Sequence, residues 1–355
     1  MDSMNKKVID KTEKDSANPP EALELLFSQN ALCSSKYDPQ TGAAGRDTVY
    51  SRWYSTDFID VSAYCGIKYE LAAHKYLISA AFYDAEKNYL DGIGTTSSCM
   101  YTVVSGICKL PRGTKYAKFI TFNGSHGCDS FDAPAVYGFS GEQELESELG
   151  RLEYPALKIA CLGDSLTEGD YGSYVVGHGC RHYRNFPYYL QRELGCETVN
   201  YGKCGYTAAK YLDFFNTPGN VDVSDADLIL IMLGTNGGLT VGSTAQKEAY
   251  LALIDAVSAK MKQDARIVLV TPPHTTEKSE KVSFGNAAKV LNAVETVREI
   301  AAAQSLPLID AYTGSPIQSD KEEVYQPYDG LHMAETGYRV FAGYMADELR
   351  KLIGQ

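Results

Sequence analysis

Five short apolar runs alternate with longer, helix-like segments between residues 155 and 355. The runs span residues 157–162, 197–200, 227–233, 266–271 and 307–310. Segments 245–262 and 286–303 carry apolar residues three and four positions apart, as helices do, and a last helix is expected from about 335 to 352. Strands that alternate with helices of this length form parallel sheets through right-handed crossovers. This part of the chain is therefore predicted to be an α/β domain with about five parallel strands.

A serine directly follows the first of these strands. The run 157–162 ends in Gly163-Asp164-Ser165-Leu166, which places Ser165 at the carboxyl end of a buried strand. Ligands of parallel α/β sheets bind at that edge, and a helix that begins just after the serine would aim unpaired N–H groups at a developing negative charge. Taken alone, a serine at this position is better interpreted as a helix N-cap. Other catalytic groups must accompany Ser165 to make it a candidate nucleophile.

Those groups follow in order along the chain. The second run leads into a turn with Gly202 and Gly205, where a backbone N–H can approach a ligand closely. The third run leads to Asn236, whose side-chain amide is a suitable donor for an oxyanion. Asp329 and His332 lie three residues apart, so the carboxylate can hold the imidazole Nδ1–H while Nε2 faces a serine. Together these residues predict a serine that is activated as a nucleophile.

These motifs resemble the GDSL, or SGNH, family of serine hydrolases across the whole second part of the chain. The four hallmark residues of that family match Ser165, Gly205, Asn236 and His332. The resemblance implies a three-layer α/β/α, flavodoxin-like domain in which Ser165 is the nucleophile, His332 the general base and Asp329 the residue that orients His332. It also implies an oxyanion hole made of the N–H groups of Ser165 and Gly205 and the side-chain amide of Asn236.

Two further sequence features bear on this resemblance. Family members often carry an aspartate directly after the hallmark asparagine, whereas this chain has Gly237. The Gly-x-Ser-x-Gly elbow of the common α/β-hydrolases occurs nowhere in the sequence. The expected fold is therefore that of the GDSL family and not that of the α/β-hydrolases.

The residues after Ser165 are candidates for substrate binding. Segment 178–182 contains two histidines and a cysteine at alternating positions, which could hold a metal ion, but the implied chemistry needs none. We therefore predict no metal and no cofactor, and interpret this loop as the rim of the active site. The rim residues would be Tyr171, Tyr174, Arg181 and Arg184. His274, after the fourth run, is a further candidate for a substrate contact, with a surface-loop histidine as the alternative.

The first part of the chain shows a different pattern, in which short alternating segments are separated by Gly, Pro, Asn and Asp. These segments are 56–61, 66–72, 76–83, 101–110 and 116–122. This spacing is typical of an all-β sandwich. Residues 82–90 and 110–116 diffusely resemble strand pairs of jelly-roll modules in bacterial surface and phage tail proteins. A jelly roll ahead of an SGNH domain also resembles carbohydrate esterase family 2, which deacetylates plant polysaccharides.

The domain organisation follows from these two patterns. Residues 1–20 are predicted to be a disordered tail, 21–140 a jelly-roll accessory domain, 141–154 an acidic, helix-prone linker and 155–355 the catalytic domain. Trp53 and the tyrosines of the accessory domain could stack on sugar rings. Strands favour aromatic residues in any case, so core or sheet positions are the preferred interpretation.

Charge and hydropathy argue against some functions. The formal net charge of −12 argues against nucleic-acid binding, because phosphate contacts need a basic surface. No run approaches the roughly 20 apolar residues of a membrane span, and the first residues lead into no apolar signal-peptide core. We expect a mature extracellular, cell-surface or virion-associated form, or a cytoplasmic protein. The oligomeric state stays open.

The sequence as a whole predicts a serine esterase that works through an acyl-serine intermediate. The expected substrate is an O-acetylated carbohydrate or polysaccharide, an expectation that depends on the domain architecture. One alternative is a lipase, thioesterase or arylesterase that acts on longer acyl groups. The other is a glycan-binding or virion adhesion protein whose esterase activity is secondary or absent.

Overall fold

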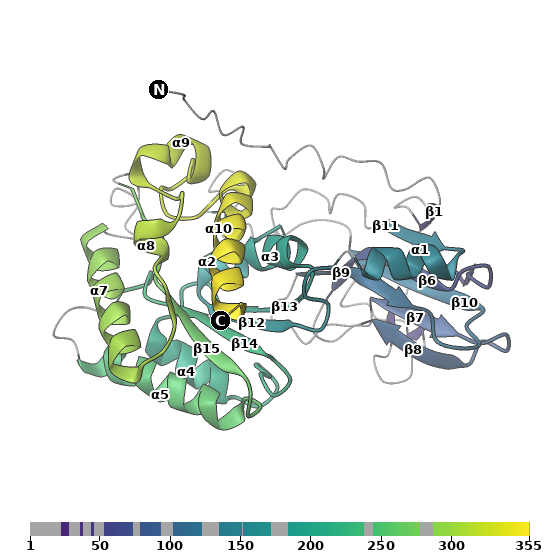
Figure 1. Cartoon of the computed structure of the whole chain (residues 1–355), viewed down its shortest axis with the longest axis horizontal. Coiled ribbons are helices and arrows are strands. Elements are labelled where there is room, and N and C mark those ends of the chain that lie inside the picture. Colours follow the sequence, from purple (N-terminus) through teal and green to yellow (C-terminus); the bar gives the residue numbers. More distant parts are fainter. Residues whose placement is uncertain are drawn as a thin grey trace.

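The computed structural model shows antiparallel sheets in the N-terminal part of the chain and a helix-covered parallel sheet in the C-terminal part (Figure 1). The residues that the structure describes are 23–27, 36–37, 44–45, 53–73, 79–93, 102–122, 135–150, 152–171, 184–237, 244–276, 278 and 287–354. The predicted tail 1–20 lies outside the described residues, as do Tyr174 and segment 178–182 with Arg181.

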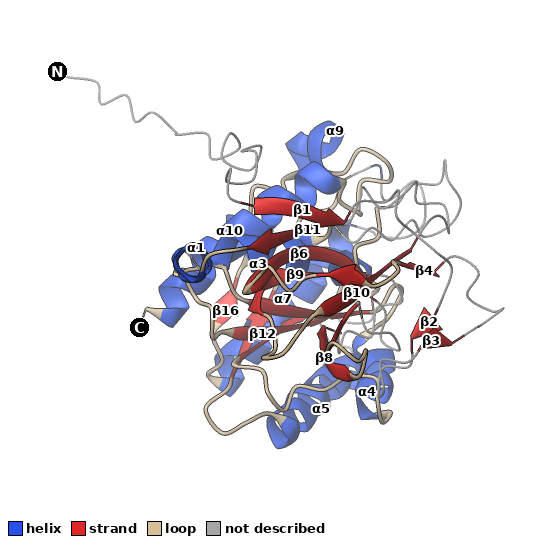
Figure 2. Ribbon diagram, turned by 90° about the vertical axis from the view of Figure 1, so that its right-hand side faces the viewer, coloured by secondary structure: helices blue, strands red, loops and turns tan. Residues whose placement is uncertain are grey.

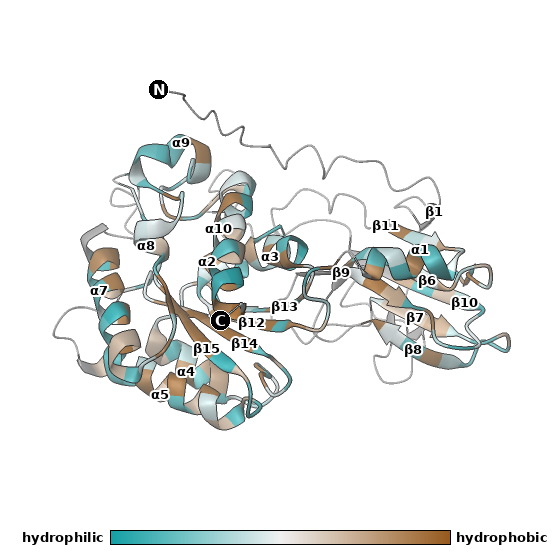
Figure 3. Ribbon diagram, viewed as in Figure 1, coloured by the Kyte–Doolittle hydropathy of each residue, from teal (hydrophilic) through white to brown (hydrophobic). Residues whose placement is uncertain are grey.

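Five parallel strands form the sheet of the C-terminal part, in the order β13-β12-β14-β15-β16. Their bounds are β12 Lys158–Gly163, β13 Glu197–Gly202, β14 Leu228–Met232, β15 Arg266–Val270 and β16 Leu308–Ile309. Every residue of β14 is buried, because a central strand is covered on both faces. Figure 3 shows the central strands mostly in brown, the colour of apolar residues. The predicted parallel sheet is confirmed.

Helices cover both faces of this sheet, and each face has its own core. One face carries α4 (Ala208–Asn216), α5 (Thr244–Lys260) and α7 (Ala287–Gln304), and the other carries α3 (Phe186–Leu194) and α10 (Glu335–Ile353). Ile231 of β14 lies in the first core and its neighbour Leu230 in the second, since successive side chains of a strand point to opposite faces. The expected three-layer α/β/α arrangement is confirmed. Within the described ranges, none of the helices is long and apolar enough to cross a membrane.

Two antiparallel sheets make up most of the described N-terminal part. One has the order β1-β11-β6-β9, and the other has the order β4-β10-β7-β8 with β5 beside β10. Figure 2 shows the four strands of the first sheet side by side. The bounds are β1 Leu23–Phe27, β4 Trp53–Ser55, β5 Ile59–Asp60, β6 Gly66–Ala73, β7 Ala80–Tyr83, β8 Tyr89–Ile93, β9 Thr102–Lys109, β10 Tyr116–Phe122 and β11 Ala135–Phe139; β2 (Lys36–Tyr37) and β3 (Ala44–Gly45) form a separate pair.

A buried core joins the two antiparallel sheets. Val136 of the first sheet shares it with Phe82 and Phe119 of the second. The predicted segments 66–72 and 116–122 coincide with β6 and β10, whereas the others are shifted or lie partly outside the described residues. The jelly-roll connectivity of this module stays a prediction.

The predicted linker contains the helix α1 (Glu142–Leu149), which packs on the first sheet. Leu145 of α1 is buried, and a Cβ placed on Gly66 of β6 would come within 2.6 Å of its side chain. The sheet also contacts the C-terminal part, because Tyr188 of α3 donates a hydrogen bond to Glu70 of β6 at 2.9 Å. The region between the two parts is therefore packed and not an open tether.

Candidate active site

The carboxyl ends of the parallel strands carry the predicted catalytic residues. Ser165 begins α2 (Ser165–Glu168) directly after β12, and Asn236 follows the end of β14. Asp329 and His332 lie in the loop between α9 (Glu322–Tyr325) and α10. The strands are parallel, so these ends meet at one edge of the sheet, where α/β proteins bind their ligands.

Asp164, and not Ser165, caps the short helix α2. Asp164 Oδ1 accepts the N–H of Leu166 at 3.1 Å, and Ser165 is the first helical residue. The N-cap interpretation of Ser165 is therefore wrong, and its hydroxyl is available for another partner. Burial raises the pKa of Asp164 to about 6, although the hydrogen bond from Leu166 acts in the opposite direction.

Ser165, His332 and Asp329 form a hydrogen-bonded chain of side chains. His332 Nε2 lies 2.9 Å from Ser165 Oγ, and His332 Nδ1 lies 2.6 Å from Asp329 Oδ2. The other carboxylate oxygen, Asp329 Oδ1, accepts the backbone N–H groups of Leu331 and His332 at 2.9 and 2.8 Å. A carboxylate only accepts, so Nδ1 carries the imidazole proton and Nε2 is free to accept the serine proton. The three side chains that the sequence predicts to act together therefore meet in space.

These three side chains are almost fully buried. The exposed fractions are 2% for Ser165, 1% for Asp329 and 8% for His332, which leaves only the histidine partly open to solvent. Burial by itself lowers the pKa of His332, but the hydrogen bond and charge of Asp329, with the charges of Asp170 and Asp164, raise it above its ordinary value. The surrounding carboxylates thus favour an imidazolium that forms during proton transfer.

The predicted oxyanion donors lie on two loops that contact each other. Gly205 follows β13 in a turn with φ of 75°, a left-handed conformation that favours glycine. Asn236 Nδ2 donates a hydrogen bond to the carbonyl of Tyr206 at 3.1 Å, which joins the loop after β14 to the Gly205 turn. The N–H of Lys203 donates to the carbonyl of Gly163 at 2.9 Å and so ties the same turn to the strand before Ser165.

The described rim candidates make contacts within the protein. Tyr171 donates a hydrogen bond to the carbonyl of Arg184 at 3.1 Å and stacks on Tyr338 with ring centroids 5.6 Å apart. Arg184 Nη1 pairs with Glu335, the first residue of α10, at 3.2 Å. These contacts anchor the two residues that flank 172–183. Within the described ranges, no group of three or more His, Cys, Asp or Glu side chains is arranged to hold a metal ion.

His274 lies in the loop after β15, against the loop that carries His332. Its ring stacks on Tyr312 with centroids 3.8 Å apart, and burial lowers its pKa. The N–H of Thr276 donates to the carbonyl of Gly330 at 2.9 Å, which fastens the two loops together. His274 thus adjoins the loop that carries Asp329 and His332, and its contact with substrate stays a prediction.

Two buried residues near Ser165 and His332 were not predicted from the sequence patterns. Gln326 is fully buried, and its Nε2 donates to the carbonyls of His274 and Leu331 at 2.8 and 2.9 Å. Glu168 is also buried, and its Oε2 accepts the N–H of Cys204 at 2.6 Å. A charged residue inside the buried turn after β12 is the one clue that could have pointed to Glu168, whereas nothing local distinguishes Gln326.

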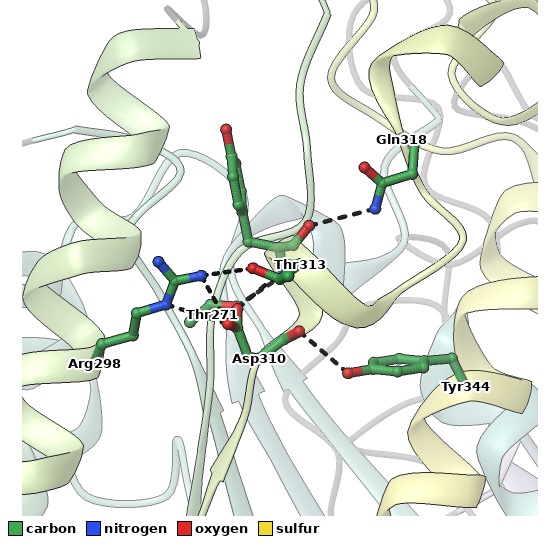
Figure 4. A network of polar contacts seen from close by, with 7 residues as sticks. Thr271, Arg298, Asp310, Thr313, Gln318 and Tyr344 are labelled. Atoms are coloured by element: carbon green, nitrogen blue, oxygen red, sulfur yellow. Dashed lines mark hydrogen bonds and ion pairs between the residues drawn. The ribbon is translucent and has the colours of Figure 1, made fainter.

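A polar network fixes the turn after β16 (Figure 4). Asp310 caps α8 (Ala311–Gly314) and accepts hydrogen bonds from Arg298 Nη2 at 2.7 Å and from Thr271 Oγ1 at 3.1 Å. Tyr344 of α10 donates to the carbonyl of Asp310 at 3.1 Å. Burial acts to raise the pKa of Asp310, but the hydrogen bonds from Arg298, Thr313 and Thr271 lower it below its ordinary value. The network therefore anchors the carboxyl ends of β15 and β16.

Comparison with known proteins gives a family match in the C-terminal part of the chain and several similar solved structures. The model of the GDSL-like Lipase/Acylhydrolase family matches residues 161–340. A lipase/acylhydrolase from Enterococcus faecalis is 21% identical, with 55% of this chain and 96% of that chain covered and a TM-score of 0.44. A carbohydrate acetylesterase family member from Sinorhizobium meliloti is 20% identical, with 56% of this chain and 100% of that chain covered and a TM-score of 0.42. An aryl esterase from M. smegmatis is 20% identical, with 56% and 100% covered and a TM-score of 0.43. No curated protein matches the sequence.

Proposed function

This chain belongs to the GDSL-like lipase/acylhydrolase family and is a carboxylic ester hydrolase, and on that premise we propose that Ser165 is its nucleophile and His332 its general base. We further propose that the substrate is an O-acetylated carbohydrate. The observation that carries the first proposal is the chain of contacts from Asp329 Oδ2 to His332 Nδ1 at 2.6 Å and from His332 Nε2 to Ser165 Oγ at 2.9 Å.

Acylation begins when Ser165 Oγ attacks the carbonyl carbon of the ester and its proton passes to His332 Nε2. The imidazolium that forms is stabilised by Asp329, which keeps the Nδ1–H in place. When the tetrahedral intermediate collapses, the bond from the carbonyl carbon to the alkoxy oxygen breaks. The alcohol leaves with the proton of His332 Nε2, and the acyl group stays on Ser165.

Deacylation repeats these steps with water as the nucleophile. Water loses a proton to His332 Nε2 and attacks the acyl carbon, and a second tetrahedral intermediate forms. The bond from the acyl carbon to Ser165 Oγ then breaks, and Ser165 takes the proton back from His332. The free acid is released and the enzyme returns to its starting state.

Three donors would hold the negative oxygen of both intermediates. We assign this role to the N–H groups of Ser165 and Gly205 and to Asn236 Nδ2, which carries two hydrogens and uses one for the Tyr206 carbonyl. Such donors act mainly on the transition state, because the oxygen gains its charge there.

The carbohydrate part of the proposal is supported by the order of the two parts of the chain. Antiparallel sheets precede the α/β domain, as the resemblance to carbohydrate esterase family 2 predicts. The order of the two parts, and no residue of a binding pocket, supports a carbohydrate substrate. A separate experiment therefore tests the substrate class.

The test is hydrolysis of p-nitrophenyl acetate, butyrate and octanoate by wild type, Ser165→Ala and a matched control. Ser224→Ala serves as the control, because Ser224 is exposed and precedes β14. It therefore lies at the amino ends of the strands, whereas Ser165 lies at their carboxyl ends. We expect activity on acetate in wild type and control and nearly none in Ser165→Ala. Full activity of Ser165→Ala would refute the nucleophile assignment.

The acyl-chain series separates the substrate classes. Preference for acetate leads to the second experiment, which measures acetate release from acetylated polysaccharides. Preference for octanoate would contradict the carbohydrate proposal and favour lipids or thioesters. If wild type hydrolyses none of the three esters and yet binds glycan, the adhesion-protein alternative would replace the catalytic proposal.

A further inference from the structure

Glu168 makes a direct contact with the loop of the proposed oxyanion hole. The side chain is only 3% exposed, although glutamate is rarely buried without a partner. Its Oε2 accepts the backbone N–H of Cys204 at 2.6 Å, a short hydrogen bond as is common for carboxylates. Cys204 immediately precedes Gly205. One partner of this buried carboxylate is therefore the peptide N–H next to a proposed oxyanion donor.

The surrounding backbone holds Glu168 rigidly against β13. A Cβ on Gly202 would stand 2.1 Å from the backbone nitrogen of Glu168, so the two backbones are in direct contact. Asn200 Nδ2 donates to the carbonyl of Thr167 at 2.7 Å, and Asn185 Nδ2 donates to the carbonyl of Glu168 at 3.2 Å. The backbone of Glu168, close to Ser165 in the same short helix, is thus held in place, and this fixes the point from which its side chain extends.

The Gly205 turn, in contrast, has open space where a side chain of residue 205 would lie. A Cβ on Gly205 would meet no atom within 4 Å, and glycine itself has the widest conformational freedom. Hydrogen bonds to its neighbours must therefore set the direction of its N–H. On one side, Cys204 is held by Glu168, and on the other, the carbonyl of Tyr206 is held by Asn236.

From this arrangement we propose that Glu168 is a positioning residue of the oxyanion hole. Its carboxylate holds the N–H of Cys204 and so directs the next N–H, that of Gly205, toward the substrate oxygen. Its effect is geometric, because a negative charge near the oxyanion would by itself be unfavourable. The inference depends on the proposed function, in which Gly205 is an oxyanion donor.

The experiment compares two substitutions of nearly equal size. Glu168→Gln keeps an oxygen that can accept the Cys204 N–H, whereas Glu168→Met fills a similar volume without an acceptor. Glu197→Met is the matched control, since Glu197 begins β13 at the opposite edge of the sheet and its side chain is mostly exposed. Each variant is assayed with p-nitrophenyl acetate and with phenylboronic acid. The boron of this inhibitor accepts the Ser165 Oγ while the serine proton passes to His332, and a boronate oxygen occupies the oxyanion hole.

We expect Glu168→Met to lower kcat by about 10- to 100-fold with KM changed by less than about twofold, because a displaced donor weakens transition-state binding alone. The affinity for phenylboronic acid should fall by a similar factor. Glu168→Gln should retain kcat within roughly threefold of wild type, since the hydrogen bond to Cys204 is kept. Glu197→Met should match wild type in both measurements.

Three results would overturn the inference. They are wild-type kcat in Glu168→Met, equal losses in Glu168→Met and Glu168→Gln, and a lower kcat with unchanged phenylboronic acid affinity. If thermal melting shows that Glu168→Met does not fold, Glu168→Asp replaces it, because its carboxylate is one methylene too short to reach Cys204. Failure of the proposed function is distinct, since it would appear as an inactive wild type or an active Ser165→Ala.

Discussion

Replacing Asp329 with asparagine tests the central hydrogen-bond chain of the site. Asp329 Oδ1 accepts two backbone N–H groups, those of Leu331 and His332, and Oδ2 faces His332 Nδ1. Asparagine has one oxygen, and the two backbone donors will keep it on the Oδ1 side. Its NH₂ group must then face Nδ1. The imidazole proton moves to Nε2, which can no longer accept the proton of Ser165.

The two backbone N–H groups that Asp329 accepts determine how far the substitution should lower kcat. To restore the active tautomer, the amide must flip and leave two buried backbone N–H groups without an acceptor, at a cost of about 1–3 kcal/mol each. The total of about 2–6 kcal/mol corresponds to a loss of kcat of roughly 30- to 10⁴-fold. The upper end agrees with the loss of about 10⁴ that this substitution causes in a serine protease triad, where the wrong tautomer forms.

The pH dependence provides a second readout. The pKa of His332 is raised, and the neutral form is the base, so wild-type activity falls as pH decreases through that raised pKa. In Asp329→Asn the hydrogen bond and charge of Asp329 are gone, so that only the charges of Asp170 and Asp164 still raise the pKa of His332, while burial still lowers it. The inflection should therefore move to lower pH.

The assay is kcat/KM for p-nitrophenyl acetate from about pH 5 to about pH 9, with circular dichroism to verify folding. An Asp329→Asn variant that is folded and within about tenfold of wild type would refute the tautomer argument. An inflection that stays at the wild-type pH would refute the assignment of Asp329 as the cause of the raised pKa.

Other substitutions test the oxyanion donors, the packing beneath them and the network after β16. Asn236→Ala should lower kcat about 10²- to 10³-fold with little change in KM, which steady-state kinetics on p-nitrophenyl acetate measures. Gly202→Ala should lower the free energy of unfolding by about 1–3 kcal/mol or more in denaturant titrations, because its Cβ would stand 2.1 Å from a backbone nitrogen of α2. Gly343→Ala, whose Cβ meets no atom within 4 Å in α10, should raise it by roughly 0.5–1 kcal/mol, and equal losses in both variants would contradict the steric argument. Arg298→Met should cost about 1 kcal/mol near neutral pH, since the pair with Asp310 is partly exposed. The pKa of Asp310 is lowered from 3.8, so this stabilisation is present above that value and disappears as pH falls further; an undiminished difference at about pH 2 would contradict it.

The sequence by itself determined the α/β architecture and the order of the proposed catalytic groups. A strand buried on both faces must be a continuous apolar run, and a helix on a sheet must repeat its apolar residues every three or four positions. Both patterns are local, so β14 and α7 could be predicted without knowledge of their neighbours. The positions of Ser165 and Asn236 after strand ends, and of His332 just before the last helix, follow from the same patterns.

The tertiary structure alone decided which loops hold the catalytic groups in place. The hydrogen bond between the Cys204 N–H and the Glu168 carboxylate joins residues 36 positions apart, and the one between Gln326 and the His274 carbonyl joins residues 52 positions apart. Tyr171 proved to contact Arg184 and Tyr338 within the protein. Such contacts depend on how far each strand is offset from the next and where each loop turns. The helix and strand patterns of the sequence do not predict these contacts. Those patterns are local, and the partners are brought together only when the sheet assembles.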